Sequence, residues 1–333
     1  MDNIMQAARP EAACSQSGAI SPAPAWVLTE GHAGMESQAL GLAEALGVAP
    51  EVRRVRARRP WDWLPGSLWP APLLGVTTEA GRLRAPWPAV AVTCGNVAAP
   101  VGAALRRRGV RAVHVQHPKM DPARFDVVVA ARHDGLTGPN VVVARNALHR
   151  VTPQRLAEAR AAWEPRLRHL PRPLVAVLLG GSNGRFRLDG EVARKLATQL
   201  GVMMRMDKAG RVVTPSRRTA PEVTRAMAER LGPLGAMVWD GRGDNPYFGL
   251  LALADAIVVT CDSVSMMSEA VATSAPVMVV DLPGRSRRIG AFIAMLQQER
   301  RVRPFAGRLQ RWAVTKLDDT PEVAAATRRM IGL

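Results

Sequence analysis

Short apolar runs alternate along most of the chain with stretches whose apolar residues recur at helical spacing. Residues 25–29 and 89–94 predict buried strands, and the residues that follow them, 35–47 and 97–109, predict helices that each end at a glycine. Further strands are expected at residues 111–116, 126–131, 174–180, 211–216, 236–240, 256–260 and 276–282. Further helices are expected at residues 189–200, 221–231, 246–254, 263–273 and 321–330. Strands that alternate with helices indicate parallel sheets with both faces covered.

The alternation is interrupted once, by a helix that begins near residue 152 and a proline-rich segment, RHLPRP, at residues 168–173. A chain of 333 residues is also longer than one ordinary core accommodates. We therefore predict an α/β protein with two Rossmann-like domains, residues 25–168 and residues 169–333, with the last helix in the second domain. Residues 1–24 are expected to form a disordered tail. Two such sheets facing each other would bring the carboxyl ends of their strands, where ligands bind, into one cleft.

The net charge of the chain indicates which kinds of molecule it can bind. The sequence has 45 lysine and arginine residues against 28 aspartate and glutamate residues, a formal net charge of +17. Such a surplus attracts nucleic acids, anionic membranes and phosphorylated substrates. No nucleic-acid-binding motif accompanies the charge, so a sequence-specific nucleic-acid partner is not expected.

The three cysteines, Cys14, Cys94 and Cys261, are far apart, and no pair has metal-ligand spacing. Neither a bound metal nor another cofactor is therefore expected. No apolar run reaches the roughly 18 residues of a membrane span. The first 24 residues also lack the layout of a signal peptide. We expect a cytoplasmic protein, either free or peripheral at the inner membrane.

Small polar residues follow the predicted strand that ends at residue 180, in the sequence GGSNGRF. Glycines allow the backbone to approach a ligand closely, and exposed amides in such a loop bind phosphate oxygens. An arginine in the loop can add a charge-assisted bond to the same anion. The alternative is an ordinary strand-to-helix turn, since the lysine of a P-loop is missing. The candidate phosphate-binding residues are Gly180, Gly181, Ser182, Asn183 and Arg185.

A second polar group follows the predicted strand at residues 256–260. Asp262 and Ser263 stand at the start of the next helix, where either side chain can cap it. Ser265 and Glu269 are four residues apart on one face of that helix, and a carboxylate there can accept both hydroxyls of a ribose. The alternative is a capped helix with a solvated glutamate. Together with the glycine loop, this group predicts a site for a nucleotide-diphosphate sugar. Further candidates for the same donor, in other loops, are Ser216, Arg217 and Asn245.

The first strand-to-helix loop, TEGHAGMESQ at residues 29–38, contains candidate catalytic groups. Histidine can accept a proton from an attacking hydroxyl near neutral pH, so His32 is a candidate general base. Glu30 and Glu36 are rival carboxylate bases in the same loop. The alternative for His32 is a surface histidine in a flexible turn.

Residues 53–74 combine a cluster of arginines with Trp61, Trp63 and Trp69. Arginine beside tryptophan suits an anionic membrane surface or a lipid-linked acceptor. Stacking combined with charge also suits a nucleic acid. The alternative is a proline-rich loop whose tryptophans fill the core of the domain.

Five segments, in this order, resemble the bacterial branch of the mitochondrial-fission "elongated mitochondria" protein family. They are WVLTEGHAGMESQALGLAEALG, HDGLTGPNVVVARNALHRV, GGSNGRFRLD, TPSRRTAP and DNPYFGLLALADAIVVTCDSVSMMSEA. The resemblance extends over residues 26–307 and implies a GT-B glycosyltransferase architecture. It also implies a protein partner, because plant members of the family are linked to recruiting a dynamin-related protein to mitochondria.

The segments GGSNG and SVSMMSEAVATSAPVMVV are also similar, more distantly, to the donor site of the N-acetylglucosaminyltransferase that completes the lipid-linked peptidoglycan precursor. This similarity implies that Gly181 and Ser182 hold phosphate and that Glu269 holds the ribose. It matches His32 with the histidine of that enzyme's N-terminal loop. Ala275 stands where glycosyltransferases usually have glycine.

These features together predict a glycosyltransferase of the GT-B kind that needs no bound metal. The second domain would bind the nucleotide-diphosphate sugar, and the first would bind the acceptor, which the Trp and Arg segment makes a candidate for a lipid-linked molecule. Three alternatives are open: a non-catalytic scaffold that acts through protein or membrane contacts, a sugar-nucleotide epimerase, and a protein that binds nucleic acid by charge.

Overall fold

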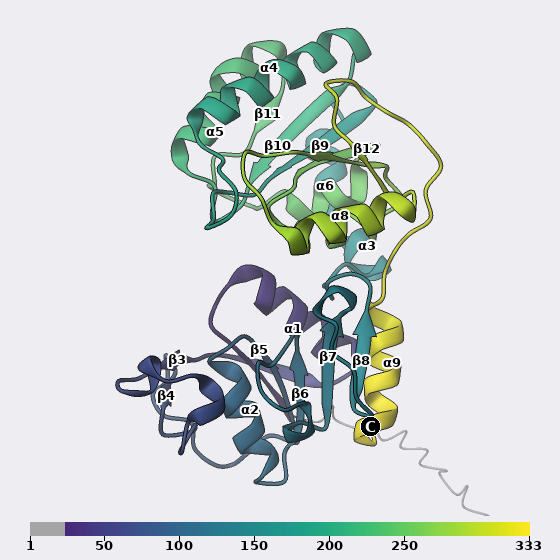
Figure 1. Ribbon diagram of the computed structural model, residues 1–333. Helices are drawn as coiled ribbons and strands as arrows, with labels where there is room; N and C mark the ends of the chain where they lie inside the picture. Colours follow the sequence, from purple (N-terminus) through teal and green to yellow (C-terminus); the bar gives the residue numbers. More distant parts are fainter. Residues whose placement is uncertain (1–23) are drawn as a thin grey trace, which may run out of the picture.

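The structure is a computed structural model that describes residues 24–333. The tail predicted at residues 1–24 lies outside the described residues, except for Pro24, which begins the first strand. Two α/β domains lie one above the other, and each is built on a six-stranded sheet (Figure 1). Neighbouring strands run parallel in both sheets, which confirms the predicted fold class.

The N-terminal sheet has the strand order β2-β1-β5-β6-β7-β8. Its strands are β1 (Pro24–Thr29), β2 (Ala49–Arg54), β5 (Val90–Cys94), β6 (Arg111–Val115), β7 (Val127–Ala131) and β8 (Val141–Ala144). Successive residues of β1 point to opposite faces, so Ala25 and Val27 pack in one cluster and Trp26 and Leu28 in another. Helices α1 (Ala33–Ala45) and α9 (Thr320–Ile331) cover the first face, and α2 (Ala98–Arg106) covers the second.

The C-terminal sheet has the strand order β11-β10-β9-β12-β13-β14. Its strands are β9 (Leu174–Leu179), β10 (Gly210–Pro215), β11 (Met237–Val238), β12 (Ala256–Thr260), β13 (Val277–Val280) and β14 (Val302–Pro304). Its helices are α3 (Pro153–Leu167), α4 (Gly190–Asp207), α5 (Pro221–Leu231), α6 (Tyr247–Leu253), α7 (Val264–Val271) and α8 (Arg287–Gln298). The central strand β9 is buried along its whole length, as its continuous apolar run predicts.

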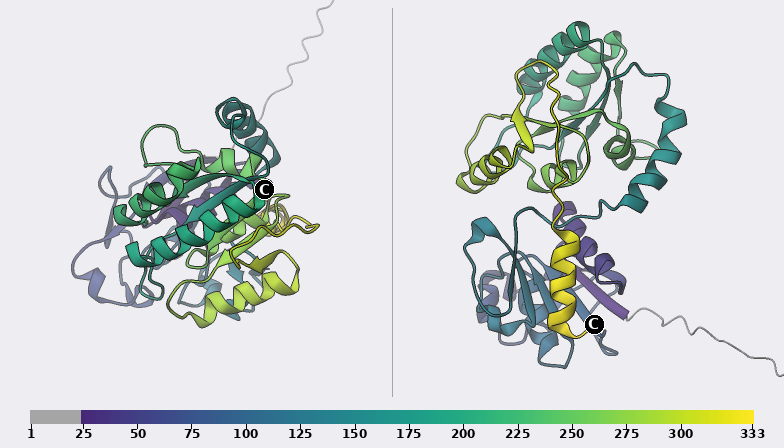
Figure 2. Two further views of the ribbon diagram at one scale, coloured as in Figure 1. Left: turned by 90° about the horizontal axis from the view of Figure 1, so that it is seen from above. Right: turned by 90° about the vertical axis from the view of Figure 1, so that its right-hand side faces the viewer.

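The last helix belongs to the N-terminal domain, so the prediction that assigned it to the second domain is wrong. Val323, Ala324 and Ile331 of α9 are buried in the core beside α1. The guanidinium of Arg328 also donates a hydrogen bond of 2.9 Å to the carbonyl oxygen of Leu46, which follows α1. The right-hand view of Figure 2 shows α9, in yellow, lying along the N-terminal domain after the chain has crossed back.

The boundary predicted between residues 168 and 169 is also displaced. Helix α3 packs on α6, and Trp163 of α3 is part of the C-terminal core. A Cβ atom on Gly249 of α6 would lie 2.3 Å from the Trp163 side chain, so only a glycine fits under this ring. The first crossing between domains therefore precedes α3, and the proline-rich segment lies inside the second domain.

The two segments that cross between the domains are tied together. Asp319, which precedes α9, accepts hydrogen bonds from the Arg145 side chain at 2.6 and 3.0 Å and from the backbone amides of Arg145 and Asn146. Asn146 Nδ2 donates to the carbonyl oxygen of Leu317 at 2.9 Å. A buried carboxylate that pairs with arginine and with backbone amides fixes the relative path of both crossings. Among residues 24–333, no helix is both long and apolar enough to cross a membrane.

Candidate functional site

A cavity of about 1220 Å³ lies between the two domains. Its walls are the segments that follow β1, β6, β7 and β8 on one side and β9, β10, β11, β12 and β13 on the other. The two sheets thus present their carboxyl ends to a shared cleft, which is where open parallel sheets place their ligands. The helices α1 and α7 begin in this cleft, at residues 33 and 264.

The cavity collects many of the residues that the sequence singles out, but not all of them. Those that line it are His32, Arg185, Ser216, Arg217, Asn245, Asp262, Ser263, Ser265 and Glu269. Those that do not line it are Glu30, Trp61, Trp63, Trp69, Gly180, Gly181, Ser182 and Asn183.

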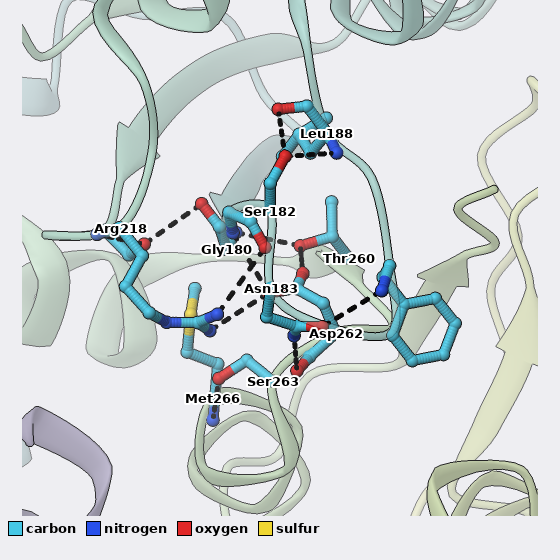
Figure 3. A network of polar contacts seen from close by, with 12 residues as sticks. Gly180, Ser182, Asn183, Leu188, Arg218, Thr260, Asp262, Ser263 and Met266 are labelled. Carbon is cyan, nitrogen blue, oxygen red and sulfur yellow. Dashed lines mark hydrogen bonds and ion pairs between the residues drawn. The ribbon is translucent and has the colours of Figure 1, made fainter. Parts of the chain in front are cut away.

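The first two glycines of the GGSNG loop, Gly180 and Gly181, contact other residues of the protein and do not line the cavity. The Gly181 amide donates a 3.0 Å hydrogen bond to Asp262 Oδ2, and the Gly180 amide donates a 2.8 Å bond to Thr260 Oγ1 (Figure 3). A Cβ atom on Gly181 would lie 2.1 Å from the carbonyl oxygen of Arg218, and one on Gly180 would lie 2.2 Å from the Asp262 carboxylate. The glycines are therefore required by close packing, and the anion that the Gly181 amide holds is a carboxylate of the protein itself.

The polar side chains of the same loop close a turn. Ser182 Oγ donates to the Leu188 carbonyl at 3.0 Å and accepts from the Leu188 amide at 2.9 Å. Asn183 Oδ1 accepts from the amides of Arg185 and Phe186, both at 2.9 Å. This is the pattern by which asparagine stabilises a turn. Arg185 is the member of this loop that lines the cavity.

Asp262 connects several loops of the C-terminal domain through hydrogen bonds. Its side chain is fully buried, and besides the Gly181 amide it accepts hydrogen bonds from Thr260 Oγ1 at 2.7 Å and from Arg218 Nη2 at 3.0 Å. These contacts hold the loops after β9, β10 and β12 together. Ser263, the next residue, caps α7 by accepting a 3.4 Å hydrogen bond from the Met266 amide, as predicted for this position.

Glu269, on α7, is the central polar group of the cleft. Its side chain is buried, with 7% of the residue exposed, and both carboxylate oxygens accept hydrogen bonds from hydroxyls. Oε1 accepts from Ser37 Oγ of α1 at 2.9 Å, and Oε2 accepts from the hydroxyl of Tyr247 of α6. Burial raises the pKa of Glu269 above its ordinary value, and the two hydroxyls oppose that shift. A carboxylate that accepts two hydroxyls is the arrangement predicted for a ribose, with protein hydroxyls in place of the sugar's.

The two domains touch beside this carboxylate. A Cβ atom on Gly34, in the first turn of α1, would lie 2.6 Å from Ser265 Oγ of α7. The Ala147 amide donates a 3.0 Å hydrogen bond to Ser268 Oγ, also on α7. Helices α1 and α7 therefore meet at their N-terminal ends, and the positive ends of two helix dipoles face the same cleft.

The three candidate bases occupy different environments. Glu30 Oε1 accepts a 2.7 Å hydrogen bond from the Val97 amide and lies outside the cavity. Glu36 lines the cavity, but Arg54 donates two hydrogen bonds to its carboxylate, at 2.9 and 3.1 Å, and lowers its pKa. A carboxylate held ionised in this way is a weak proton acceptor. His32 precedes α1 with an exposed side chain in the cleft.

The cleft carries an excess of positive charge. Its lining includes seven arginines and four acidic residues. The arginines are Arg145, Arg150, Arg185, Arg217, Arg218, Arg225 and Arg288. Within residues 24–333, Arg185, Arg217 and Arg225 form no ion pair. Water-excluding clefts lined by one sign of charge concentrate ligands of the other sign, so an anionic ligand fits this cavity.

Comparison with known proteins places the chain in a family. It matches the family described as Mitochondrial fission ELM1 over residues 33–331. The chain belongs to this family. It is 32% identical over 272 residues to mitochondrial fission protein ELM1 of Arabidopsis thaliana, an alignment that covers 73% of this chain and 64% of the plant protein. The chain thus spans just under two thirds of the length of that relative. The family resemblance found in the sequence is confirmed.

Solved structures establish the fold of this ELM1-family protein. The UDP-GlcNAc 2-epimerase of Methanocaldococcus jannaschii, in complex with UDP-GlcNAc and UDP, aligns with a TM-score of 0.54 and 10% identity, covering 93% of this chain and 99% of that one. The glycotransferase of kitacinnamycin aligns with a TM-score of 0.51 and 12% identity, covering 93% and 95%. The predicted GT-B architecture is confirmed.

Two residues of this site were not singled out by the sequence: Ser37 and Tyr247. Ser37 lies within the strand-to-helix loop at residues 29–38. Tyr247 is the only tyrosine of the chain, and this rarity could have marked it as a candidate site residue. Within residues 24–333, no group of three or more His, Cys, Asp or Glu side chains could hold a metal ion.

Proposed function

We propose that the cleft binds a nucleotide-diphosphate sugar and that the protein transfers the sugar to an acceptor held by the N-terminal domain. The observation that carries the proposal is the buried Glu269 carboxylate in an arginine-lined cleft. Each of its two oxygens accepts a hydrogen bond from a hydroxyl group. The structural relative in complex with UDP-GlcNAc and UDP supports uridine nucleotides as the first ligands to test.

The ribose is assigned to Glu269. A vicinal diol presents two hydroxyl donors, and a carboxylate accepts both. Ser37 belongs to the N-terminal domain and Tyr247 to the same domain as Glu269. A ribose hydroxyl would therefore replace Ser37 at Oε1, while Tyr247 keeps the carboxylate oriented. Exchange of one hydroxyl for another leaves the buried carboxylate paired, which avoids the cost of an unpaired buried charge.

The diphosphate is assigned to the rim of the same cleft. Arg185 and Arg217 line the cavity without an ion pair inside residues 24–333, and Ser263 and Ser265 at the N-terminal end of α7 line the same cavity. Helix N-termini and guanidinium groups are the groups that bind phosphate oxygens most directly. We therefore assign phosphate binding, which was predicted for the glycine loop, to Arg185, Arg217 and the start of α7.

The proposed reaction is attack of an acceptor hydroxyl oxygen on the anomeric carbon of the sugar. The bond from that carbon to the diphosphate oxygen breaks, and the leaving diphosphate keeps the electron pair. Arg185 and Arg217 would stabilise the charge that develops there. The hydroxyl proton would pass to the imidazole of His32, which lines the cavity from the N-terminal domain. A lipid-linked molecule remains the proposed class of acceptor.

The second candidate is a non-catalytic scaffold of the same fold. It is favoured by hydrogen bonds within the protein. Ser37 and Tyr247 already donate to the Glu269 carboxylate, and Asp262 already accepts from the Gly181 amide, so these groups are not free for a ligand. Such a protein would act through a protein partner or a membrane surface, as the resemblance to the plant members implies.

Isothermal titration calorimetry with UDP, UDP-N-acetylglucosamine, ADP and GDP separates these functions. The transferase proposal expects at least one nucleotide to bind, and it expects Glu269→Gln to weaken binding by about tenfold or more. Glu229→Gln, an exposed glutamate on α5, is the matched control and should bind like the native protein. Binding of none of the four to the native protein would favour the scaffold.

Turnover distinguishes transfer from epimerisation. Incubation of the native protein with UDP-N-acetylglucosamine alone should leave the sugar unchanged when followed by NMR. A second epimer that accumulates without an acceptor would overturn the transferase proposal and establish the epimerase alternative.

A further inference from the structure

A compact loop projects from the N-terminal domain between the two short antiparallel strands β3 (Arg56–Ala57) and β4 (Val76–Thr77). We call residues 58–75 the β3–β4 loop. Its ends are joined, since the Arg58 amide donates a 2.8 Å hydrogen bond to the Gly75 carbonyl. Two single turns of 3₁₀ helix, Trp61–Trp63 and Gly66–Leu68, lie within it. The loop lies at the outer edge of its domain, on the side away from α9 (Figure 1).

Two of the three tryptophans predicted to contact a membrane face the inside of this loop. The Trp61 ring packs under Gly75, where a Cβ atom would lie 2.7 Å from it. Trp69 is 8% exposed, and its Nε1 donates a 3.0 Å hydrogen bond to the Leu64 carbonyl. These two side chains hold the loop together, as the alternative of core-filling tryptophans predicts, and they are not available to a partner.

Other apolar side chains of the loop face solvent. Trp63 is 73% exposed, Leu68 66%, Leu74 54% and Leu64 45%. Ten large hydrophobic residues are exposed in residues 24–333, and four of them fall within this loop. The loop is stabilised by its inner tryptophans, so the outward side chains are not needed for its fold. Apolar side chains gathered in this way mark an interaction surface.

The surroundings of the loop are basic. Arg56, Arg59, Arg82 and Arg84 are exposed, and within the described part of the chain none of the four forms an ion pair. The acidic residues between positions 56 and 84 are Asp62 and Glu79. The charge of this region is thus complementary to an anionic surface.

We propose that the β3–β4 loop docks the protein on an anionic lipid bilayer. Tryptophan and leucine partition into the interface between head groups and acyl chains, while arginines contact the lipid phosphates. A nucleic acid would use the arginines and one ring, but it offers no apolar phase for the three leucines. The proposal rests on exposure and charge in the loop and is independent of the function proposed for the cleft.

Vesicle co-sedimentation tests this proposal with the full chain. The native protein should pellet with vesicles that contain phosphatidylglycerol and much less with vesicles of phosphatidylcholine alone. The double variant Leu68→Glu/Leu74→Glu should lose about tenfold or more of its partitioning, because two apolar anchors are replaced by charges that the lipid repels. Trp63→Ser is a second variant that removes one anchor without adding charge, and it should weaken binding in the same direction.

Met206→Glu is the matched control. Met206 lies on α4 in the other domain and is 61% exposed, similar to Leu68. Met206→Glu changes the net charge as much as Leu68→Glu or Leu74→Glu alone would, but it should pellet like the native protein. Thermal melts followed by circular dichroism should be alike for all variants, since each altered side chain is exposed.

Three outcomes would overturn the proposal. The first is failure of the native protein to pellet with anionic vesicles. The second is equal pelleting of the loop variants and Met206→Glu, which would show that the net charge of the chain alone causes the binding. The third is native-level vesicle binding by both Trp63→Ser and the double variant, which would show that the loop does not contact the bilayer.

Discussion

Two carboxylates of the cleft, Asp262 and Glu269, show how environment separates side chains of similar chemistry. Asp262 is paired with the Arg218 guanidinium and with the Gly181 amide, so its negative charge is compensated inside the protein. Within residues 24–333, the donors to Glu269 are the hydroxyls of Ser37 and Tyr247. Hydroxyls can be exchanged for those of a ligand, whereas a buried ion pair is costly to break. The first carboxylate therefore builds the site, and the second is the one that we assign to the ligand.

The residue types of the site could be predicted from the sequence, but their partners could not. Small and polar side chains end apolar strands after residues 180 and 260, and this pattern indicates both loops. Gly181 and Asp262 are 81 positions apart, and only the fold shows that one binds the other. The predicted phosphate loop was a reasonable interpretation of glycines that the structure uses to admit Asp262 and Arg218.

The packing of Gly181 predicts the effect of adding a single methyl group. Gly181→Ala should lower the free energy of unfolding by about 2 kcal/mol or more, because its Cβ would clash with the Arg218 backbone. Gly184→Ala is the control in the same loop, since a Cβ there would have no neighbour within 4 Å. Urea unfolding without any nucleotide measures both. Equal stability of the two variants would contradict the packing role.

The raised pKa of Glu269 predicts a pH-dependent effect on stability. A carboxyl whose pKa is raised on folding binds protons more tightly in the folded state, so its contribution to stability falls as the pH rises above its ordinary value of 4.5. Glu269→Gln cannot ionise, so its stability relative to the native protein should increase as the pH rises through that window and then level off. Urea unfolding of both proteins across the pH range measures the difference. A difference that does not vary with pH would contradict the prediction.

At the scale of elements, the strands of the two six-stranded sheets that the apolar pattern did not predict lie at the sheet edges. They are β2, β8 and β14. Edge strands have one unpaired side and are partly exposed, so they need no long apolar run. β2 reads APEVRR, and β14 has only three residues. Helix α8 was also missed, although Ile289, Phe292 and Leu296 have the spacing of a buried helical face.

The C-terminal end of α7, the helix that carries Glu269, depends on one buried arginine. Arg301 is 2% exposed, and its guanidinium donates to the carbonyl oxygens of Val271, Thr273 and Ala275. Burial lowers its pKa to about 10, which still leaves it charged at neutral pH. These bonds satisfy carbonyl oxygens that a helix end leaves without partners.

Arg301→Met should therefore lower the free energy of unfolding by about 2–4 kcal/mol, since buried carbonyl oxygens lose their donors. Arg303→Met is the neighbouring control. Arg303 is exposed and lies 4.5 Å from the Trp312 ring, so its loss should cost about 1 kcal/mol or less. Urea unfolding measures both variants, and a larger loss for Arg303→Met than for Arg301→Met would show that α7 is held in another way.

At the scale of the whole molecule, the division into two similar α/β halves could be predicted, but the path of the chain between them could not. The proline-rich segment was a plausible boundary by composition. The contacts of Trp163 with α6 and of Val323 and Ile331 with α1 are long-range packing, which leaves no mark in local sequence. The return of α9 gives the N-terminal domain a second covalent connection to its neighbour.

The tie between the two crossings predicts a large contribution from Asp319. Asp319→Ala should lower the free energy of unfolding by about 3 kcal/mol, because Arg145 and two backbone amides lose a buried acceptor. Asp244→Ala is the control, since its ion pair with Arg166 is on the surface and should contribute about 1 kcal/mol or less. Similar unfolding midpoints for the two variants in urea would contradict the structural role of the tie.

The central claim is that one nucleotide lies across the cleft with its ribose on Glu269. A crystal structure of the native protein grown with UDP tests it most directly. The account predicts ribose hydroxyls within hydrogen-bond distance of the Glu269 carboxylate, with the Ser37 hydroxyl displaced from Oε1 and the diphosphate beside Arg217 and the start of α7. A nucleotide bound elsewhere, or with its ribose turned away from Glu269, would contradict the account.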